Sequence, residues 1–262
     1  MWDTYKRKMK IILDGYRKGT EFNIHMKENG LIWAGQMGHS LTWMDAVVEG
    51  KAVTPRIGFA VEINALWYNA IMFSLEIARE AGDKRFIKQW EPIAEMIPES
   101  FKNTFWSEEK GYLADVVDET FTDWSVRPNQ VIAASLPYRA IDESICLDVV
   151  STAQKVLLTT RGLRTLSPQD PKYKGTYYGD QATRDSAYHQ GTVWPWLFGH
   201  FAEAYLRIYG KSGVDYIASL YKGFEPVMTE AGIGSVSEVY DGDPPHLPGG
   251  TISQAWSVSE LL

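Results

Sequence analysis

Apolar residues along the chain follow two kinds of helical pattern, and the two kinds alternate. In the first kind the apolar residues occupy one side, as in residues 3–18, where Tyr5, Met9 and Leu13 share a face and lysines occupy the other. In the second kind they cover most of the circumference, which predicts a helix buried on every side. The one-sided segments are residues 3–18, 85–105, 142–158 and 214–228. The segments of the buried kind are residues 61–82, 129–136, 193–209 and 253–262.

This alternation predicts an all-α fold over residues 1–262, organised as a single domain. Each outer helix would form a hairpin with a buried one, and hairpins that stack side by side produce two concentric rings, an α/α toroid. A solenoid of helix pairs is the competing architecture. The sequence shows no period of the kind that short repeats produce, so we favour the toroid.

The connections differ in length according to where they lead. Those that leave a buried helix are short, whereas those that enter one are long, at residues 19–57, 106–127, 159–191 and 229–252. In a toroid all entries to the inner ring lie at one end, so the four long loops are expected to meet at one mouth. Long loops inside a compact domain are usually functional. Within the first loop, Glu28-Asn29-Gly30 between two apolar runs predicts a β-hairpin.

Composition limits the partners and the compartment. The chain has 262 residues, of which 45% are hydrophobic and 23% charged, as is typical of a globular protein with a large core. Its net charge of -7, without a basic cluster, argues against nucleic acid or an anionic membrane as a partner. One cysteine, Cys146, excludes an internal disulfide, and no segment has the apolar length of a signal peptide or a membrane span. The cytoplasm is therefore the expected location.

The long loops collect aromatic and polar residues together. Aromatic residues make up 13% of the chain, with ten Trp and fourteen Tyr, and several of them occur in polar, glycine-rich loops. Carboxylates and amides beside aromatic rings suit polyols, because rings stack on the apolar faces of a sugar while polar groups bind its hydroxyls. The pattern indicates a sugar-binding site at the mouth.

Other chemistries find little support in the sequence. The five histidines are scattered without a His-x-x-x-His pair, so no metal site is expected. Gly210-Lys211-Ser212 is not a phosphate loop, because Tyr205 stands where the leading glycine belongs. The segment from Gly234 to Glu238 lacks the closing glycine of a nucleophile elbow, and no dinucleotide fingerprint is present. We therefore expect no cofactor.

Two carboxylates remain as candidates for catalysis. Asp45 follows Trp43 by two residues, and burial against Trp43 and Met44 would favour its protonated form, as a general acid needs. Glu238 lies in the last long loop and is the candidate base on the other side of the mouth. For Asp45 alone the simpler interpretation is a turn or helix-cap residue. For Glu238 alone a solvated loop charge is an equal alternative.

Seven short runs, spread over most of the chain, are specific in combination. They are Leu41-Thr42-Trp43-Met44-Asp45-Ala46, Thr54-Pro55-Arg56-Ile57-Gly58, Glu62-Ile63-Asn64-Ala65-Leu66-Trp67-Tyr68-Asn69, Arg127-Pro128-Asn129-Gln130, Tyr188-His189-Gln190-Gly191-Thr192-Val193-Trp194-Pro195-Trp196, Ser237-Glu238 and Ser253-Gln254-Ala255-Trp256-Ser257. Together they resemble the amylo-α-1,6-glucosidase family, the C-terminal domain of glycogen debranching enzymes. The resemblance implies an (α/α)6 barrel that hydrolyses α-1,6-linked glucose of glycogen or α-glucan with inversion. It also implies Asp45 as the general acid and Glu238 as the general base.

The chain departs from the family in the number of helix pairs. A full barrel has six pairs, and the pattern provides about four, so the chain resembles the final portion of the family's domain. A gap in the ring would leave helices of the buried kind partly exposed, and such surfaces favour self-association.

The matching runs also supply candidates for binding an α-glucan. The candidate stacking surfaces are Trp43, Trp67 and Trp194. The candidate contacts for sugar hydroxyls are Arg56, Glu62, Asn64, His189 and Gln190. Two alternatives to this hydrolase stay open: a non-catalytic glucan-binding module, and another toroid sugar enzyme such as a glucoamylase-like hydrolase or an epimerase.

Overall fold

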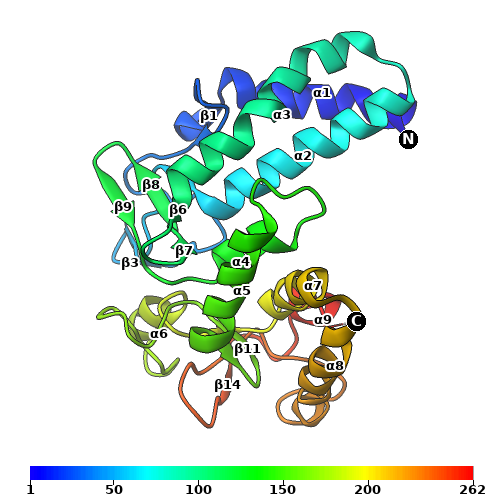
Figure 1. Cartoon of the computed structure of the whole chain (residues 1–262). Coiled ribbons are helices and arrows are strands. Elements are labelled where there is room, and N and C mark those ends of the chain that lie inside the picture. Colours follow the sequence, from blue (N-terminus) through cyan, green and yellow to red (C-terminus); the bar gives the residue numbers. More distant parts are fainter. Residues whose placement is uncertain (262) are drawn as a thin grey trace.

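The buried helices pack side by side, as the alternating pattern predicts (Figure 1). The computed structural model describes residues 1–261, and in it α2 (Val61–Glu80) contacts α4 (Asn129–Ser135), which in turn contacts α7 (Leu197–Tyr209). All seven residues of α4 are buried. These three helices therefore form an inner layer. No helix within the described residues is both long and apolar enough to cross a membrane.

The one-sided helices cover this inner layer from outside. α3 (Lys84–Phe105) packs on α2, α5 (Glu143–Val156) packs on α4 and α7, and α8 (Val214–Lys222) packs on α7. α1 (Trp2–Lys18) packs on α2 at the other end of the layer. Each predicted outer segment thus contains a helix that pairs with an inner one.

Aspartates fix where two of the outer helices begin. Asp83 accepts a hydrogen bond from the backbone N–H of Phe86 at 3.0 Å, and Asp142 accepts one from Ile145 at 3.0 Å. Both are side-chain caps, which satisfy N–H groups that the first helical turn leaves unpaired. α3 continues through its two prolines.

The remaining helical elements are short. They are η1 (Glu21–Asn23), α6 (Gln181–Ala187), η2 (Gly210–Gly213), η3 (Pro226–Thr229) and α9 (Ala255–Ser259). α9 occupies part of the predicted segment 253–262, whose last residue, Leu262, lies outside the described residues. α6 lies inside the third long loop, where no helix was predicted.

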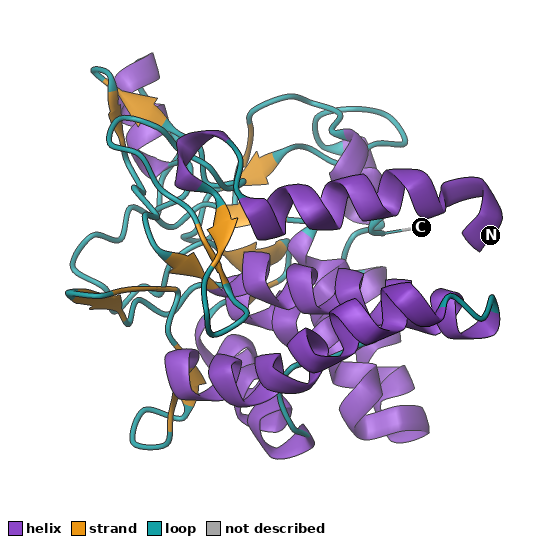
Figure 2. Ribbon diagram, turned by 90° about the horizontal axis from the view of Figure 1, so that it is seen from above, coloured by secondary structure: helices purple, strands orange, loops and turns teal. Residues whose placement is uncertain are grey.

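The all-α prediction is wrong in the long loops, which contain short strands. Figure 2 shows these strands and the loops gathered on one side of the helices. The strands are β1 (His25–Met26), β2 (Ile32–Trp33), β3 (Val47–Val48), β4 (Lys51–Ala52), β5 (Phe59–Ala60), β6 (Trp106–Ser107), β7 (Tyr112–Leu113), β8 (Val116–Asp118), β9 (Phe121–Asp123), β10 (Leu158–Thr159), β11 (Gly162–Arg164), β12 (Val193–Trp194), β13 (Val239–Tyr240) and β14 (Pro248–Gly249). The predicted hairpin is confirmed, since β1 pairs antiparallel with β2.

The strands tie the long loops to one another. β5 of the first loop pairs with β8 of the second, and β9 extends that sheet. Strands β10 to β14 form one five-stranded sheet in that order, which joins the third loop to the fourth. The pairings join the loops two by two, and the backbone N–H of Ser167 donates to the carbonyl of Val126 at 3.0 Å, which joins the second loop to the third, in line with the predicted convergence.

The segment before α7 differs from its prediction. Residues 193–209 were expected to form one helix, but Val193 and Trp194 form β12, between β11 and β13. Pro195 disfavours the helical conformation at the residue before it, and the neighbouring strands offer backbone partners instead. The helix begins at Leu197, after that proline.

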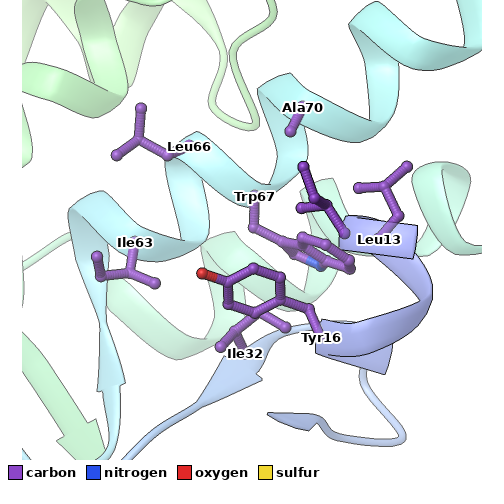
Figure 3. A pocket seen from close by; sticks show the side chains of 8 residues that line it. Leu13, Tyr16, Ile32, Ile63, Leu66, Trp67 and Ala70 are labelled. Carbon is purple, nitrogen blue, oxygen red and sulfur yellow. The ribbon is translucent and has the colours of Figure 1, made fainter. Parts of the chain in front are cut away.

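The α1 side of the inner layer is partly open. A groove of about 230 Å³ between α1 and α2 is lined by apolar residues, among them Tyr16, Leu66, Trp67 and Ala70 (Figure 3). Leu66 is 43% exposed, although it belongs to a helix of the buried kind. Trp67, a candidate stacking surface, packs against Tyr16 with ring centroids 5.8 Å apart and lines this groove.

The β1–β2 hairpin is clamped to α2 by one side chain. The amide of Asn64 accepts a hydrogen bond from the backbone N–H of Ile32 at 2.6 Å, and it donates to the carbonyls of Ile32 at 3.1 Å and Ala60 at 3.0 Å. Asn64 is fully buried. Its polar atoms are engaged with backbone, so it supports the fold rather than offering a group to a ligand.

We predict that Asn64→Ala lowers the free energy of unfolding by about 2–3 kcal/mol, because buried backbone groups of β2 lose their partner. Urea denaturation followed by circular dichroism measures this change. Asn103, exposed on α3, provides the control, and Asn103→Ala should change stability by less than about 0.5 kcal/mol. Equal effects of the two substitutions would contradict the clamp.

Candidate active site

A buried ion cluster lies where the first two long loops meet the start of α2. Arg56 binds both carboxylate oxygens of Glu62, with Nη2 at 2.6 Å from Oε2, and its Nε donates to Asp115 at 2.8 Å. The side chains of all three are at most 4% exposed. Burial alone would lower the pKa of Arg56, but the charges of Asp115 and Glu62 outweigh it and the pKa is raised. The arginine is therefore permanently charged and held in place.

The cluster continues toward the predicted acid. Asp115 accepts a hydrogen bond from Asn129 Nδ2 at 2.7 Å, and Asn129 Oδ1 accepts one from the indole N–H of Trp43 at 2.7 Å. Trp43 precedes Asp45 by two residues. A continuous chain of polar contacts thus fixes the segment that carries Asp45.

Trp43 is also packed among rings between the end of the third loop and the start of α7. It makes edge-to-face contacts with His189, Trp194 and Trp196 at centroid distances of 5.2, 5.6 and 5.1 Å. Such arrangements suit the charge distribution of aromatic rings. Trp43 itself is only partly buried, so part of its ring remains accessible. Trp194, by contrast, is 1% exposed and belongs to the core.

Glu238 is buried and hydrogen-bonded from three sides. Its carboxylate accepts from the hydroxyl of Tyr188, from the backbone N–H of Thr251 at 2.8 Å and from Gln254 Nε2 at 3.2 Å. These donors come from the third loop, the fourth loop and the cap of α9. The alternative of a solvated loop charge does not fit, because Glu238 is 9% exposed.

Asp45 has a different setting from the one expected. Its neighbours Met44 and Ala46 are buried, but Asp45 itself is exposed, so the expected burial against Trp43 and Met44 is not found. The loop alternates inward and outward side chains at this point, and the carboxylate is one of those that face solvent.

The two carboxylates nonetheless both contribute to the raised pKa of one tyrosine. The pKa of Tyr188 is raised well above its usual value, first by burial, then by its hydrogen bond to Glu238 and by the charges of Glu238, Tyr177 and Asp45. Packing agrees, since β3, which begins two residues after Asp45, contacts α6, which ends just before Tyr188. The segment that follows Asp45 and the carboxylate of Glu238 therefore lie near the same tyrosine, from opposite ends of the sequence.

His189 lies in this aromatic cluster as a neutral group. Its ring stacks on Trp194 at 5.4 Å with an interplanar angle of 19°, and no described residue bonds to its two ring nitrogens. Burial lowers its pKa to about 3, with the nearby charges of Arg127 and Arg56 adding to the effect. It is fully buried, which separates its ring from the open mouth.

Other predicted hydroxyl contacts are used inside the protein. Gln190 accepts a hydrogen bond from Arg127 Nη2 at 2.8 Å and is buried. Arg56 and Glu62 bind each other, and Asn64 binds backbone. These side chains hold the loops together, so we leave them out of the proposed sugar contacts. Trp67 is left out as well, because it faces the α1–α2 groove.

Several residues that shape the site were not among the predicted site residues. They are Asp115, Asn129, Tyr188, Thr251 and Gln254. Asn129, Tyr188 and Gln254 belong to the matching runs, which was a usable signal. Thr251 contributes only its backbone N–H, for which residue type gives no signal.

Within the described residues, no group of three or more His, Cys, Asp or Glu is arranged to hold a metal ion.

The ion cluster yields a stability prediction. Glu62→Gln should lower the free energy of unfolding by about 3 kcal/mol, because a buried arginine charge loses one of its partners. The Arg79–Glu91 pair, with side chains 46% and 41% exposed, supplies the control. Glu91→Gln should cost less than about 1 kcal/mol. Thermal and urea unfolding of both variants measure the difference, and comparable losses would count against the cluster.

His189 yields a pH prediction. Its folded pKa of about 3 lies below the ordinary 6.5, so the unfolded chain binds an extra proton as the pH falls. The associated stability is complete above pH 6.5 and is lost toward pH 3. Between pH 7 and pH 5 the wild type should lose about 2 kcal/mol more than His189→Phe.

The His189 comparison uses urea unfolding of both proteins at the two pH values. The variant keeps a ring against Trp194 but cannot titrate, and His189→Gln serves as a second non-titrating variant. Other groups contribute equally to all three proteins and cancel in the difference. Equal losses in wild type and variants would exclude the buried neutral histidine.

Known proteins resemble this chain in sequence and in fold. A family model described as amylo-alpha-1,6-glucosidase matches residues 1–262. The glycogen debranching enzyme of Saccharomyces cerevisiae (strain ATCC 204508 / S288c) is 25% identical over 240 residues, which cover 74% of this chain and 15% of that protein.

Two solved structures resemble the fold. Neutral trehalase Nth1 from Saccharomyces cerevisiae matches with a TM-score of 0.60 and 18% identity, covering 82% of this chain and 39% of that one. The GH63 mannosylglycerate hydrolase from Thermus thermophilus matches with a TM-score of 0.54 and 16% identity, covering 78% of this chain and 45% of that one.

These comparisons bear on fold and family separately. The two solved structures are toroid folds, and at such identities they speak for the fold alone. The chain spans less than half the length of each of the three relatives. The family match, however, extends over the whole sequence, and the chain belongs to the amylo-alpha-1,6-glucosidase family.

Proposed function

We propose that the chain hydrolyses α-1,6-linked glucose at the branch points of an α-glucan, with inversion at the anomeric carbon. The observation that carries this proposal is that β3, which follows Asp45, packs on α6, which precedes Tyr188, while the hydroxyl of Tyr188 donates to Glu238. Two carboxylates from the first and last loops at one mouth are what a glycosidase needs. Family membership supports the same reaction class.

In the proposed mechanism the two carboxylates have different tasks. Asp45, exposed at the rim, donates a proton to the glycosidic oxygen as the bond to glucose breaks. Glu238 accepts a proton from a water molecule, which attacks the anomeric carbon from the opposite face. Its three hydrogen bonds fix the direction in which its carboxylate points. An inverting pair needs a separation of roughly 6.5–9.5 Å to admit that water.

The proposed sugar contacts start from Trp43. Its ring is partly accessible and lies beside the segment that carries Asp45. A ring in this position would stack on the apolar face of the glucose unit whose bond is cleaved. The cluster of Arg56, Glu62 and Asp115 acts behind it, through Asn129, as a positioning group.

We also propose that the chain forms about four of the six helix pairs of the family's ring. The exposed apolar residues of α2 support an open ring, since a closed one would cover them. Leu66 and Phe73 are 43% and 39% exposed on that helix. Sedimentation as a function of protein concentration tests whether this surface brings two copies of the chain together.

Incubation with isomaltosyl oligosaccharides, followed by proton NMR of the glucose released, tests the reaction. We expect β-glucose as the first product. Asp45→Asn and Glu238→Gln should each lower kcat by about 10²–10⁴-fold, because each removes a proton-transfer group. Asp148→Asn, on the exposed face of α5, is the control and should leave kcat unchanged.

The outcomes separate the competing functions. Release of α-glucose would indicate a retaining reaction, and binding of the oligosaccharide without release would indicate a glucan-binding module. An Asp45→Asn variant that keeps the full rate would remove Asp45 from the mechanism.

A further inference from the structure

An open cavity adjoins Glu238 on the side of the third loop. Its volume is about 570 Å³, within the range of small-molecule sites. It is lined by Tyr177, Tyr178, Gly179, Arg184, Gly249 and Gly250. Neither tyrosine was assigned to the proposed hydrolysis. We call the pair Tyr177 and Tyr178 the tyrosine ledge.

The cavity shares its wall with the candidate base. A Cβ atom added at Gly250 would lie 2.5 Å from Glu238 Oε2, so this glycine lines the cavity on one side and touches the carboxylate on the other. Tyr177 stacks on Tyr188 with centroids 5.5 Å apart, and Tyr188 donates its hydroxyl to Glu238. A ligand in the cavity would therefore lie directly beside the reacting centre.

The segment that forms the ledge is fixed by its own contacts. The backbone N–H of Tyr177 donates to Asp241 at 2.6 Å, and Arg184 Nη1 donates to the carbonyl of Gly179 at 2.8 Å. The ring of Tyr177 lies against Gly249, where an added Cβ would approach it to 2.8 Å. The wall is thus preformed, and only a residue without a side chain fits beneath the ring.

Tyr178 stands out from this fixed wall. It is 81% exposed and lines the cavity next to Tyr177. A phenol ring offers an apolar face and a hydroxyl, and the cavity adds a guanidinium and backbone groups of three glycines. Together these suit a neutral ligand that has apolar faces and many hydroxyls, which describes a sugar chain.

We propose that the tyrosine ledge binds the linear α-glucan chain that carries the branch. The inference rests on the proposed function and extends it from the cleaved glucose to the chain beyond it. Tyr178 faces solvent, so a ligand that reaches it from Glu238 must extend outward beyond the cleaved glucose. The ledge therefore contributes to binding of long glucans and little to binding of short ones.

Binding of a linear malto-oligosaccharide of seven units, measured by titration calorimetry on the full chain, tests the ledge without any hydrolysis. Tyr178→Ala should weaken this binding about fivefold, whereas Tyr178→Phe, which keeps the ring, should bind within about twofold of wild type. Tyr5→Ala, which removes another exposed tyrosine from α1, is the control and should bind as wild type does. Circular dichroism checks that each variant is folded.

Hydrolysis gives a second measurement. Tyr178→Ala should raise KM about fivefold for a branched glucan with a long main chain, and should leave KM unchanged for a short isomaltosyl substrate. Equal binding of the linear chain by wild type and Tyr178→Ala, or no binding by wild type, would overturn the ledge. Ledge-dependent binding together with absent hydrolysis would support the ledge and refute the proposed function, so the two failures are distinguishable.

Discussion

The placement of Arg56 between Glu62 and Asp115 is the constraint on which the mouth depends. Three charged side chains at most 4% exposed are costly to remove from water, and they are tolerable because each oxygen and nitrogen has a close partner. The contacts join the first loop, the start of α2 and the second loop. They reach Trp43 through Asn129, so the geometry near Asp45 depends on a buried cluster.

The helical layers follow from the sequence because their signals are local and repeated. The outer helices show a one-sided apolar period, and caps such as Asp83 and Asp142 mark the starts of two of them. Strands of two or three residues carry no such period. Val193 and Trp194 are apolar in a helix as in a strand, and only their pairing with β11 and β13 decides between the two. That pairing depends on loops far away in the sequence.

The residue types that a site needs can be predicted from the sequence, but the directions in which its side chains point cannot. Glu238 and Asp45 were proposed because a two-carboxylate reaction requires acidic residues and the loops that carry them were expected to meet. Residue type does not reveal whether a polar side chain faces the mouth or the protein. Asn64, at the loop end of α2, turns its amide to β2, and its partner Ile32 is 32 positions away. For His189, burial beneath other rings was equally invisible in the sequence.

The two proposed catalytic groups are prepared to different degrees. Glu238 is enclosed and fixed by three donors before any ligand arrives, whereas Asp45 is exposed. A general acid works best when water is excluded from it, since desolvation favours its protonated form. In the proposed mechanism the glucan itself supplies that exclusion, because a sugar stacked on Trp43 would cover the adjacent Asp45. Glu238 would then be fixed in the folded protein before the substrate binds, whereas Asp45 would be shielded from water only by the bound substrate.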